Sequence, residues 1–129
     1  MKIQRTISKT LKSWKNSPTR KPLVLQGARQ VGKTWLLKNF GMEEFESMAY
    51  FNFDSQPELK QFFSTTKDTK RLIQNLSLVH GKTILPEKTL VIFDEIQECN
   101  EALNTLKYFC EDSPEYCIAC AGSLLGVAM

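Results

Sequence analysis

The hydrophobic positions of this chain follow two patterns, one typical of amphipathic helices and one typical of buried strands. Near the start, apolar residues recur at helical spacing with lysines between them, which predicts a basic amphipathic helix over residues 3–15. Its apolar side is formed by Ile3, Ile7, Leu11 and Trp14. Further along, short apolar runs bounded by polar residues predict four strands. These runs are 23–25, 48–53, 90–93 and 116–121.

Between the predicted strands, apolar residues return at helical spacing and are bounded by helix start and stop signals. The predicted helices are 34–40, 57–63, 68–79 and 100–111. Gly41 is expected to end the first helix, Asp54 or Ser55 to cap the second, and Asn100 to cap the fourth. Strands and helices therefore alternate along the chain, as in α/β folds with a mostly parallel sheet.

The first apolar run leads directly into a segment with the spacing of a phosphate-binding loop. The pattern G-x-x-x-x-G-K-S/T is formed by Gly27, Gly32, Lys33 and Thr34. Glycines let consecutive backbone N–H groups point at a β-phosphate, and the helix N-terminus that follows adds positive potential. In such a loop Lys33 reaches the β- and γ-phosphates, and the Thr34 hydroxyl binds Mg²⁺. The sequence therefore predicts a nucleotide site between a strand and a helix.

A second informative segment, TLVIFDEIQ at 89–97, is a hydrophobic strand that ends in two carboxylates. Ligands bind at the carboxyl edge of parallel sheets, so Asp94 and Glu95 are expected beside the phosphate-binding loop. Asp94 would hold Mg²⁺ through water, and Glu95 would polarise the attacking water as a general base. The last strand delivers Ser123 to the same edge. Ser123 is predicted either to contact the γ-phosphate or the water, or to cap a turn.

Composition and charge favour a single-domain protein without a membrane span, and they raise the question of a nucleic-acid surface. With 129 residues and 42% hydrophobic content, the chain is expected to form one domain around one core. It has no run of 18 apolar residues and no secretory signal, which predicts a cytoplasmic protein without a membrane span. All ten lysines and arginines of the first 42 positions precede the first acid, Glu43. A nucleic-acid surface or a solvated helix face explains this excess, and we favour the solvated face because no RNA-binding pattern accompanies it.

The four cysteines are predicted to be reduced core residues. Cys117 and Cys120 lie three positions apart in a predicted strand, so their side chains point to opposite faces of the sheet. No second C-x-x-C pair accompanies them. This arrangement disfavours a zinc site or a disulfide.

Four segments, in this order, resemble the prokaryotic AAA-type ATPases that join an N-terminal ATPase core to a C-terminal domain of unknown function. They are GARQVGKT, YFNFD, TLVIFDEIQ and AGSLLGV, and the resemblance covers about 13–129. It implies a phosphate-loop sheet with strand order 5-1-4-3-2, magnesium at Thr34 and Asp94, catalytic Glu95 and Lys33, and a sensor-like Ser123. ATP would bind at Gly27, Ala28, Arg29, Gln30, Val31, Gly32, Lys33 and Thr34.

Compared with that family, the chain stops soon after Ser123, so we expect an incomplete domain with strand order 2-3-4-1 and the fifth strand missing. Residues 1–21 would be a basic helix and connector leading into it. The strand before the phosphate-binding loop would then be an exposed edge, prone to self-association. No arginine follows Arg71, so any arginine finger contributed from beyond the second acidic motif would come from missing sequence or another subunit. We expect weak or no turnover by the chain alone.

Two classes of function remain open at this stage. One is an ATPase module whose hydrolysis drives an attached domain, and the other is a nucleotide-binding remnant or switch that acts through binding only. Glu95 favours the first class, because a binding-only protein needs no carboxylate beside the metal acid. The truncation favours the second. A small-molecule kinase fits poorly with the Asp-Glu pair, and a GTPase fits poorly because no N-K-x-D motif is present.

Overall fold

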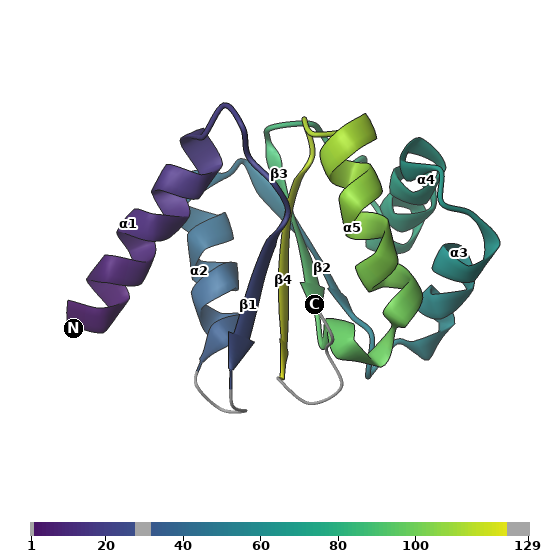
Figure 1. The fold of residues 1–129 in the computed structure, drawn as a ribbon, viewed down its shortest axis with the longest axis horizontal. Helices are drawn as coiled ribbons and strands as arrows, with labels where there is room; N and C mark the ends of the chain where they lie inside the picture. Colours follow the sequence, from purple (N-terminus) through teal and green to yellow (C-terminus); the bar gives the residue numbers. More distant parts are fainter. Residues whose placement is uncertain (1, 28–31, 124–129) are drawn as a thin grey trace.

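The protein is built in three layers around a parallel sheet. This computed structural model describes the backbone of residues 2–27 and 32–123, with side chains from Ile7 onward. Within these residues the sheet has four parallel strands in the order β1-β4-β3-β2, which confirms the predicted order (Figure 1). The strands are β1 (Leu23–Gly27), β2 (Ser47–Asn52), β3 (Thr89–Asp94) and β4 (Cys117–Ser123).

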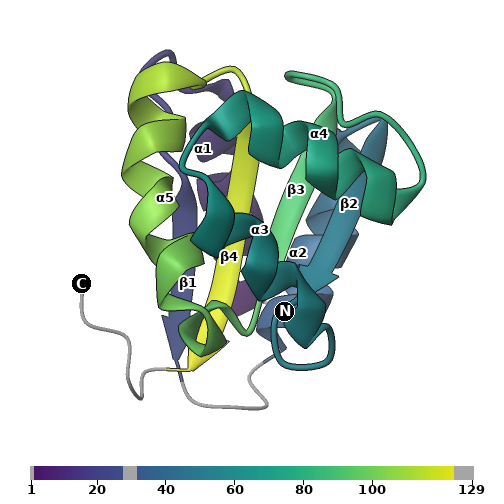
Figure 2. The same ribbon diagram turned by 90° about the vertical axis from the view of Figure 1, so that its right-hand side faces the viewer.

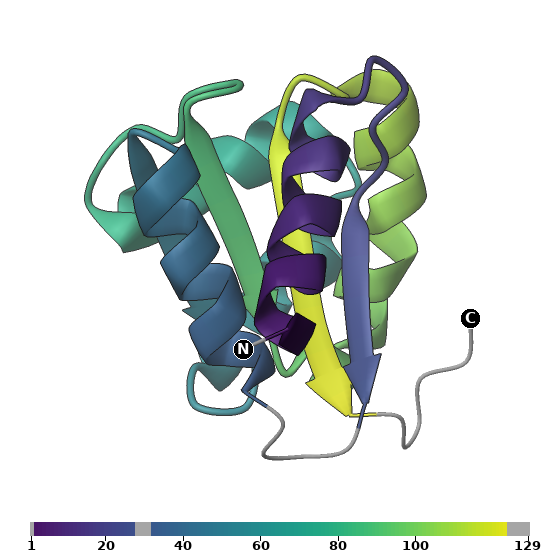
Figure 3. The same cartoon turned by 90° about the vertical axis from the view of Figure 1, so that its left-hand side faces the viewer.

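Helices cover both faces of the sheet. Helices α1 (Lys2–Asn16) and α2 (Lys33–Glu44) lie on one face (Figure 3). The other face is covered by α3 (Lys60–Thr65), α4 (Thr69–His80) and α5 (Asn100–Asp112) (Figure 2). Two 3₁₀ turns, Pro57–Leu59 and Ile96–Glu98, precede α3 and α5. Among the helices in the described ranges, none combines the length and the apolar character that crossing a membrane would require.

The core is divided by the sheet, and β3 contributes to both halves. Leu90 and Ile92 pack toward α1 and α2, whereas Val91 and Phe93 pack toward the other helices. The ring centroid of Phe93 lies 5.5–6.2 Å from those of three other buried phenylalanines. These are Phe51, Phe53 and Phe63. All six residues of β3 are buried, as its uninterrupted apolar run predicts.

The predicted end of α2 is wrong, because the helix continues through Gly41 to Glu44. Gly41 lies where α2 presses on the sheet. A Cβ added there would meet the Met48 Sδ atom at 3.0 Å and the Leu90 Cδ2 atom at 3.2 Å. This glycine therefore permits a close approach of helix and sheet, whereas a helix-ending glycine would adopt a left-handed conformation.

The two capping predictions are also wrong. The Asn52 Oδ1 atom accepts hydrogen bonds from the backbone N–H groups of Asp54 and Ser55, at 2.9 and 3.0 Å. Asn52 thereby organises the turn, and neither Asp54 nor Ser55 caps the helix after it. Asn100 is the first residue of α5, one position past the cap, and the cap position has no side-chain hydrogen bond. Both helices are held by packing in place of the predicted caps.

The cysteines lie where the strand geometry places them. Cys117 packs in the core on the α1–α2 side and Cys120 in the core on the other side, which confirms that they point to opposite faces. All four thiols are free. Burial raises the pKa of the Cys99, Cys117 and Cys120 thiols, which disfavours the reactive thiolate.

Some of the basic residues near the N-terminus attach α1 and the connector after it to the rest of the domain. The Lys12 ammonium lies 3.5 Å from the Glu44 carboxylate, and Lys15 donates to the Glu44 carbonyl oxygen. The Arg20 guanidinium donates to the Lys15 and Pro114 carbonyl oxygens, at 2.9 and 3.0 Å. These contacts give three of the basic residues a structural role.

Candidate functional site

The carboxyl ends of all four strands meet at one edge of the sheet, the lower edge in Figure 1. The strand register pairs Gly27 with Ser123 and Asn52 with Asp94. Helix α2 starts at this edge, after Gly32, which has the left-handed conformation (φ 77°) that glycine tolerates best. The structure therefore brings the predicted phosphate-binding and acidic segments together. Ala28, Arg29, Gln30 and Val31 lie outside the described residues.

The two residues predicted to hold magnesium contact each other directly. The Thr34 Oγ1 atom, in the first turn of α2, donates a hydrogen bond to the Asp94 Oδ2 atom at 2.7 Å. Asp94 ends β3, one of the two internal strands, and is 5% exposed. A hydroxyl and a carboxylate oxygen are ligands that Mg²⁺ prefers. The donor set therefore fits this metal, and the metal role stays a prediction.

A tyrosine from the YFNFD segment, for which the sequence predicted no role, contacts the same carboxylate. The Tyr50 hydroxyl donates to the Asp94 Oδ2 atom at 2.5 Å, and the Glu95 N–H donates to the Asp94 Oδ1 atom at 2.9 Å. Tyr50 in turn accepts a hydrogen bond from the Asn52 Nδ2 atom at 3.2 Å, and the Lys38 ammonium lies 3.9 Å from its ring centroid. Burial, together with the hydrogen bond to Asp94, raises the pKa of Tyr50 to about 12. The phenol is therefore a donor at neutral pH.

Glu95, the predicted general base, has a left-handed backbone with φ 53° and ψ 44°. For a residue other than glycine this conformation costs about 1–3 kcal/mol and is concentrated at functional sites. It ends β3 and starts the 3₁₀ turn Ile96–Glu98. The turn brings the Gln97 Nε2 atom within 3.4 Å of the Glu95 Oε1 atom, to which it donates a hydrogen bond.

Gln97 also reaches the end of the neighbouring strand. Its Oε1 atom accepts a hydrogen bond from the Ser123 N–H at 3.3 Å. A Cβ added to Gly122 would lie 2.5 Å from that Oε1 atom, so glycine is required for this approach. One amide side chain therefore links the predicted base, Glu95, to the predicted sensor, Ser123.

The sequence analysis assigned no role to Tyr50, Asn52, Lys38 or Gln97, although Tyr50 and Asn52 belong to the YFNFD segment that carries part of the family resemblance. Strand alternation offers a signal for two of them, because residues 48, 50 and 52 share one face of β2 and become more polar toward its carboxyl end. The contact of Lys38 with Tyr50 depends on how α2 packs on the sheet. The position of Gln97 depends on the left-handed backbone of Glu95. Sequence spacing predicts neither of these features.

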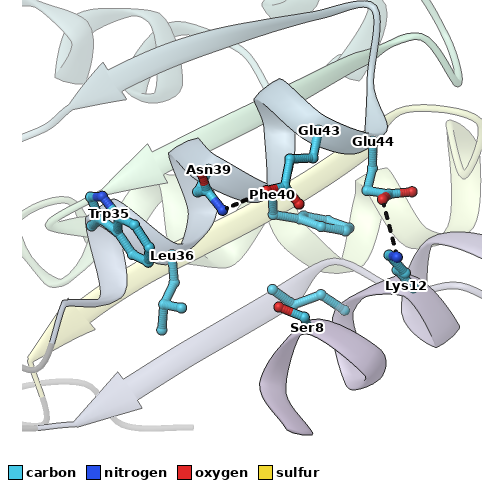
Figure 4. Close-up of a pocket in the computed structure, with 9 residues that line it drawn as sticks. Ser8, Lys12, Trp35, Leu36, Asn39, Phe40, Glu43 and Glu44 are labelled. Carbon is cyan, nitrogen blue, oxygen red and sulfur yellow. Dashed lines mark hydrogen bonds and ion pairs between the residues drawn. The ribbon is translucent and has the colours of Figure 1, made fainter. Parts of the chain in front are cut away.

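A separate pocket between α1 and α2 is a poor candidate for a nucleotide (Figure 4). Its volume is about 100 Å³, well below the ~300 Å³ at which ligand sites begin. At its rim, the Lys12 ammonium lies 3.5 Å from the Glu44 carboxylate, and the Asn39 Nδ2 atom donates to the Glu43 Oε1 atom at 3.1 Å. We interpret it as a gap in helix packing.

Comparison with known proteins supports the fold. The chain is similar to PCH-2 of C. elegans, with 14% identity and a TM-score of 0.52 over 99% of its own residues. It is also similar to the ORC1 protein of Aeropyrum pernix, solved in complex with DNA, with 14% identity and a TM-score of 0.55 over 95% of its residues. The chain spans 38% of the length of each of these structures. No curated protein is similar enough to count as a match.

The family comparison covers most of the chain. Residues 19–129 match the model of a family described as an AAA domain. This region includes all four strands, the phosphate-binding motif and the Asp94–Glu95 pair. The sequence resemblance, the parallel sheet of order β1-β4-β3-β2 and the family model agree, and the chain belongs to the AAA-domain family.

Proposed function

We propose that this chain is an ATP-binding AAA-type module whose Mg²⁺-dependent hydrolysis is coupled to a domain or partner outside it. The observation that carries the proposal is the direct contact of Thr34 with Asp94. It joins the first turn of α2, the helix after the phosphate-binding motif, to the carboxyl end of β3. This is the juxtaposition that a nucleotide bound through Mg²⁺ requires.

The phosphate-binding motif and the described contacts support the following roles for the chain's own residues. Gly27 through Thr34 would bind the phosphates, with Lys33 reaching the β- and γ-phosphates. Thr34 and Asp94 would hold Mg²⁺, which when bound neutralises charge on the phosphate oxygens. Glu95 would accept a proton from the attacking water. Ser123 lies at the same edge and would contact the γ-phosphate or that water.

The position of Glu95 favours hydrolysis over binding alone. Its carboxylate is held by Gln97, and its backbone conformation is one that proteins retain mainly where the surroundings enforce it. No arginine follows Arg71, so an arginine finger contributed from beyond the Asp94–Glu95 pair would be supplied from outside the given residues. Such a finger is worth about 10³–10⁵ in rate. We therefore propose slow turnover in isolation.

A binding titration tests the proposal. A fluorescent ATP analogue with Mg²⁺ is titrated into the wild type, Lys33→Ala and Lys107→Ala, a control that removes the same charge from α5. Loss of a charge-assisted phosphate contact of about 1.5–3 kcal/mol should weaken binding by Lys33→Ala at least ~10-fold. The control should match the wild type, and ATP should displace the analogue better than GTP does.

Two results would count against the proposal. Absence of saturable binding by a wild-type chain that melts cooperatively would reject the nucleotide site. Equal affinities for wild type and Lys33→Ala would reject the assignment of the phosphate-binding loop. Hydrolysis is followed in the same samples as phosphate release, where Glu95→Gln should abolish the slow turnover. Fast release by the wild-type chain alone would contradict the need for a partner.

A further inference from the structure

One oxygen of Asp94 accepts hydrogen bonds from two hydroxyl groups. The Thr34 Oγ1 atom lies 2.7 Å from the Asp94 Oδ2 atom, and the Tyr50 phenolic oxygen lies 2.5 Å from the same atom. The Glu95 N–H occupies the other carboxylate oxygen. Thr34 belongs to the predicted metal ligands, but no predicted role accounts for Tyr50.

The surroundings of Tyr50 fix the direction of its hydroxyl. The Asn52 Nδ2 atom can only donate to the phenolic oxygen, at 3.2 Å, and the Asp94 carboxylate oxygen can only accept, so the phenolic proton is directed at Asp94. The ring lies under the Lys38 ammonium, 3.9 Å from its centroid. Strand pairing aligns Tyr50 with Ile92 and Asn52 with Asp94, so the backbone also holds the donor in register with the carboxylate.

The two hydroxyl groups would have different roles at a bound Mg²⁺, because only Thr34 is an expected metal ligand. A hydroxyl that gives a lone pair to Mg²⁺ keeps its proton, so Thr34 would contact the metal and the Asp94 carboxylate together. The Tyr50 hydroxyl on one oxygen and the Glu95 N–H on the other contact only the carboxylate, so they would orient it independently of the metal. Partners of this kind orient a metal-binding carboxylate, and their loss typically weakens metal binding 10–100-fold.

We propose that Tyr50 is a positioning residue for the Mg²⁺–nucleotide complex. It would hold the Asp94 carboxylate in the orientation that the metal site requires. This inference rests on the proposed function, because it assigns Tyr50 a part in the same site. It predicts that the Tyr50 hydroxyl affects the magnesium-dependent part of nucleotide affinity and leaves the magnesium-independent part unchanged.

The variant Tyr50→Phe removes the hydroxyl and keeps the ring under Lys38. Affinity for a fluorescent ATP analogue is measured in EDTA and over a series of Mg²⁺ concentrations, well below the melting midpoints of all variants. Tyr108→Phe, which removes a phenolic hydroxyl from α5, is the matched control, and Asp94→Asn is the positive control. Tyr50→Phe should raise the Mg²⁺ concentration at half-maximal effect about tenfold. Its affinity in EDTA should stay within about twofold of the wild type.

Each other outcome overturns the inference in a distinguishable way. If Asp94→Asn shifts the Mg²⁺ midpoint and Tyr50→Phe does not, Tyr50 does not position the carboxylate. If Tyr50→Phe weakens binding by the same factor with Mg²⁺ and in EDTA, its role is structural only. If the folded wild-type chain binds no nucleotide in any condition, the proposed function fails, and the role of Tyr50 fails with it.

Discussion

Strands β1 and β3 each bring one half of the candidate site to the same edge of the sheet, but their settings differ. β3 pairs with β2 and β4, and all six of its residues are buried. β1 pairs with β4 and forms an edge of the sheet in the part of the chain that the structure describes. Leu23, Val24 and Leu25 are only half-buried, and Gln26 is exposed.

The two halves of the candidate site are therefore supported differently, one by a buried internal strand and the other by a half-buried edge strand. Asp94 is the last residue of a buried strand that pairs on both sides, so its position is tied to the stability of the whole domain. The phosphate-binding half follows a strand fixed from one side, and the segment before that strand supplies part of its support through Arg20. Substitutions in β3 should therefore act on global stability, and those near β1 should have smaller effects.

The largest effect is expected from truncating the centre of β3. Phe93→Ala removes a ring that contacts three other buried phenylalanine rings, and it should lower the free energy of unfolding by about 3–5 kcal/mol. The matched truncation in β1, Val24→Ala, removes a half-buried side chain and should cost less than ~1.5 kcal/mol. Urea denaturation followed by circular dichroism measures both. Equal losses would contradict the distinction between a core-supported and an edge-supported half.

An intermediate effect is expected at the start of β1. Arg20→Met keeps the aliphatic stem but loses the donors to the Lys15 and Pro114 carbonyl oxygens, and it should cost about 2–3 kcal/mol. Glu87 forms an ion pair with Arg20, and the Glu87 side chain is 61% exposed. Glu87→Gln removes the charge of this exposed partner and should lower the free energy of unfolding by less than ~1 kcal/mol. Denaturation midpoints compare the two variants. A larger loss for Glu87→Gln would mean that the surface ion pair, and not the carbonyl contacts, holds this segment.

The smallest stability effect is expected at Gly122. In Gly122→Ala the new Cβ would displace the end of the Gln97 side chain, a flexible group, so the free energy of unfolding should change by less than ~1 kcal/mol. Displacement would break the link between Glu95 and Ser123, so single-turnover hydrolysis should slow severalfold. Gln97→Ala should slow it equally, and the double variant should slow it no further. Independent, additive losses would show that Gly122 acts by another route.

Sequence patterns predicted most of the architecture and the segments that form the candidate site, but not the side chains that connect those segments. Buried strands have continuous apolar runs, and the phosphate-binding motif and the Asp94–Glu95 pair have fixed local spacing, so all of these are visible in one sequence. The contact between Tyr50 and Asp94 joins strands 44 positions apart and depends on their register. The position of the Gln97 side chain depends on the left-handed backbone conformation of Glu95, which is uncommon for a residue other than glycine. Features of this kind arise only when the elements pack, so local sequence rules do not predict them.

The most direct test of the account is a double-mutant cycle between Thr34 and Asp94 in nucleotide binding. Affinity for the fluorescent ATP analogue is measured for wild type, Thr34→Val, Asp94→Asn and the double variant, each with Mg²⁺ and in EDTA. The account predicts that each single variant loses most of the magnesium-dependent gain, and that the double variant loses no more. In EDTA the four proteins should bind alike. Additive losses, or losses of equal size in EDTA, would contradict a single magnesium site shared by the two halves.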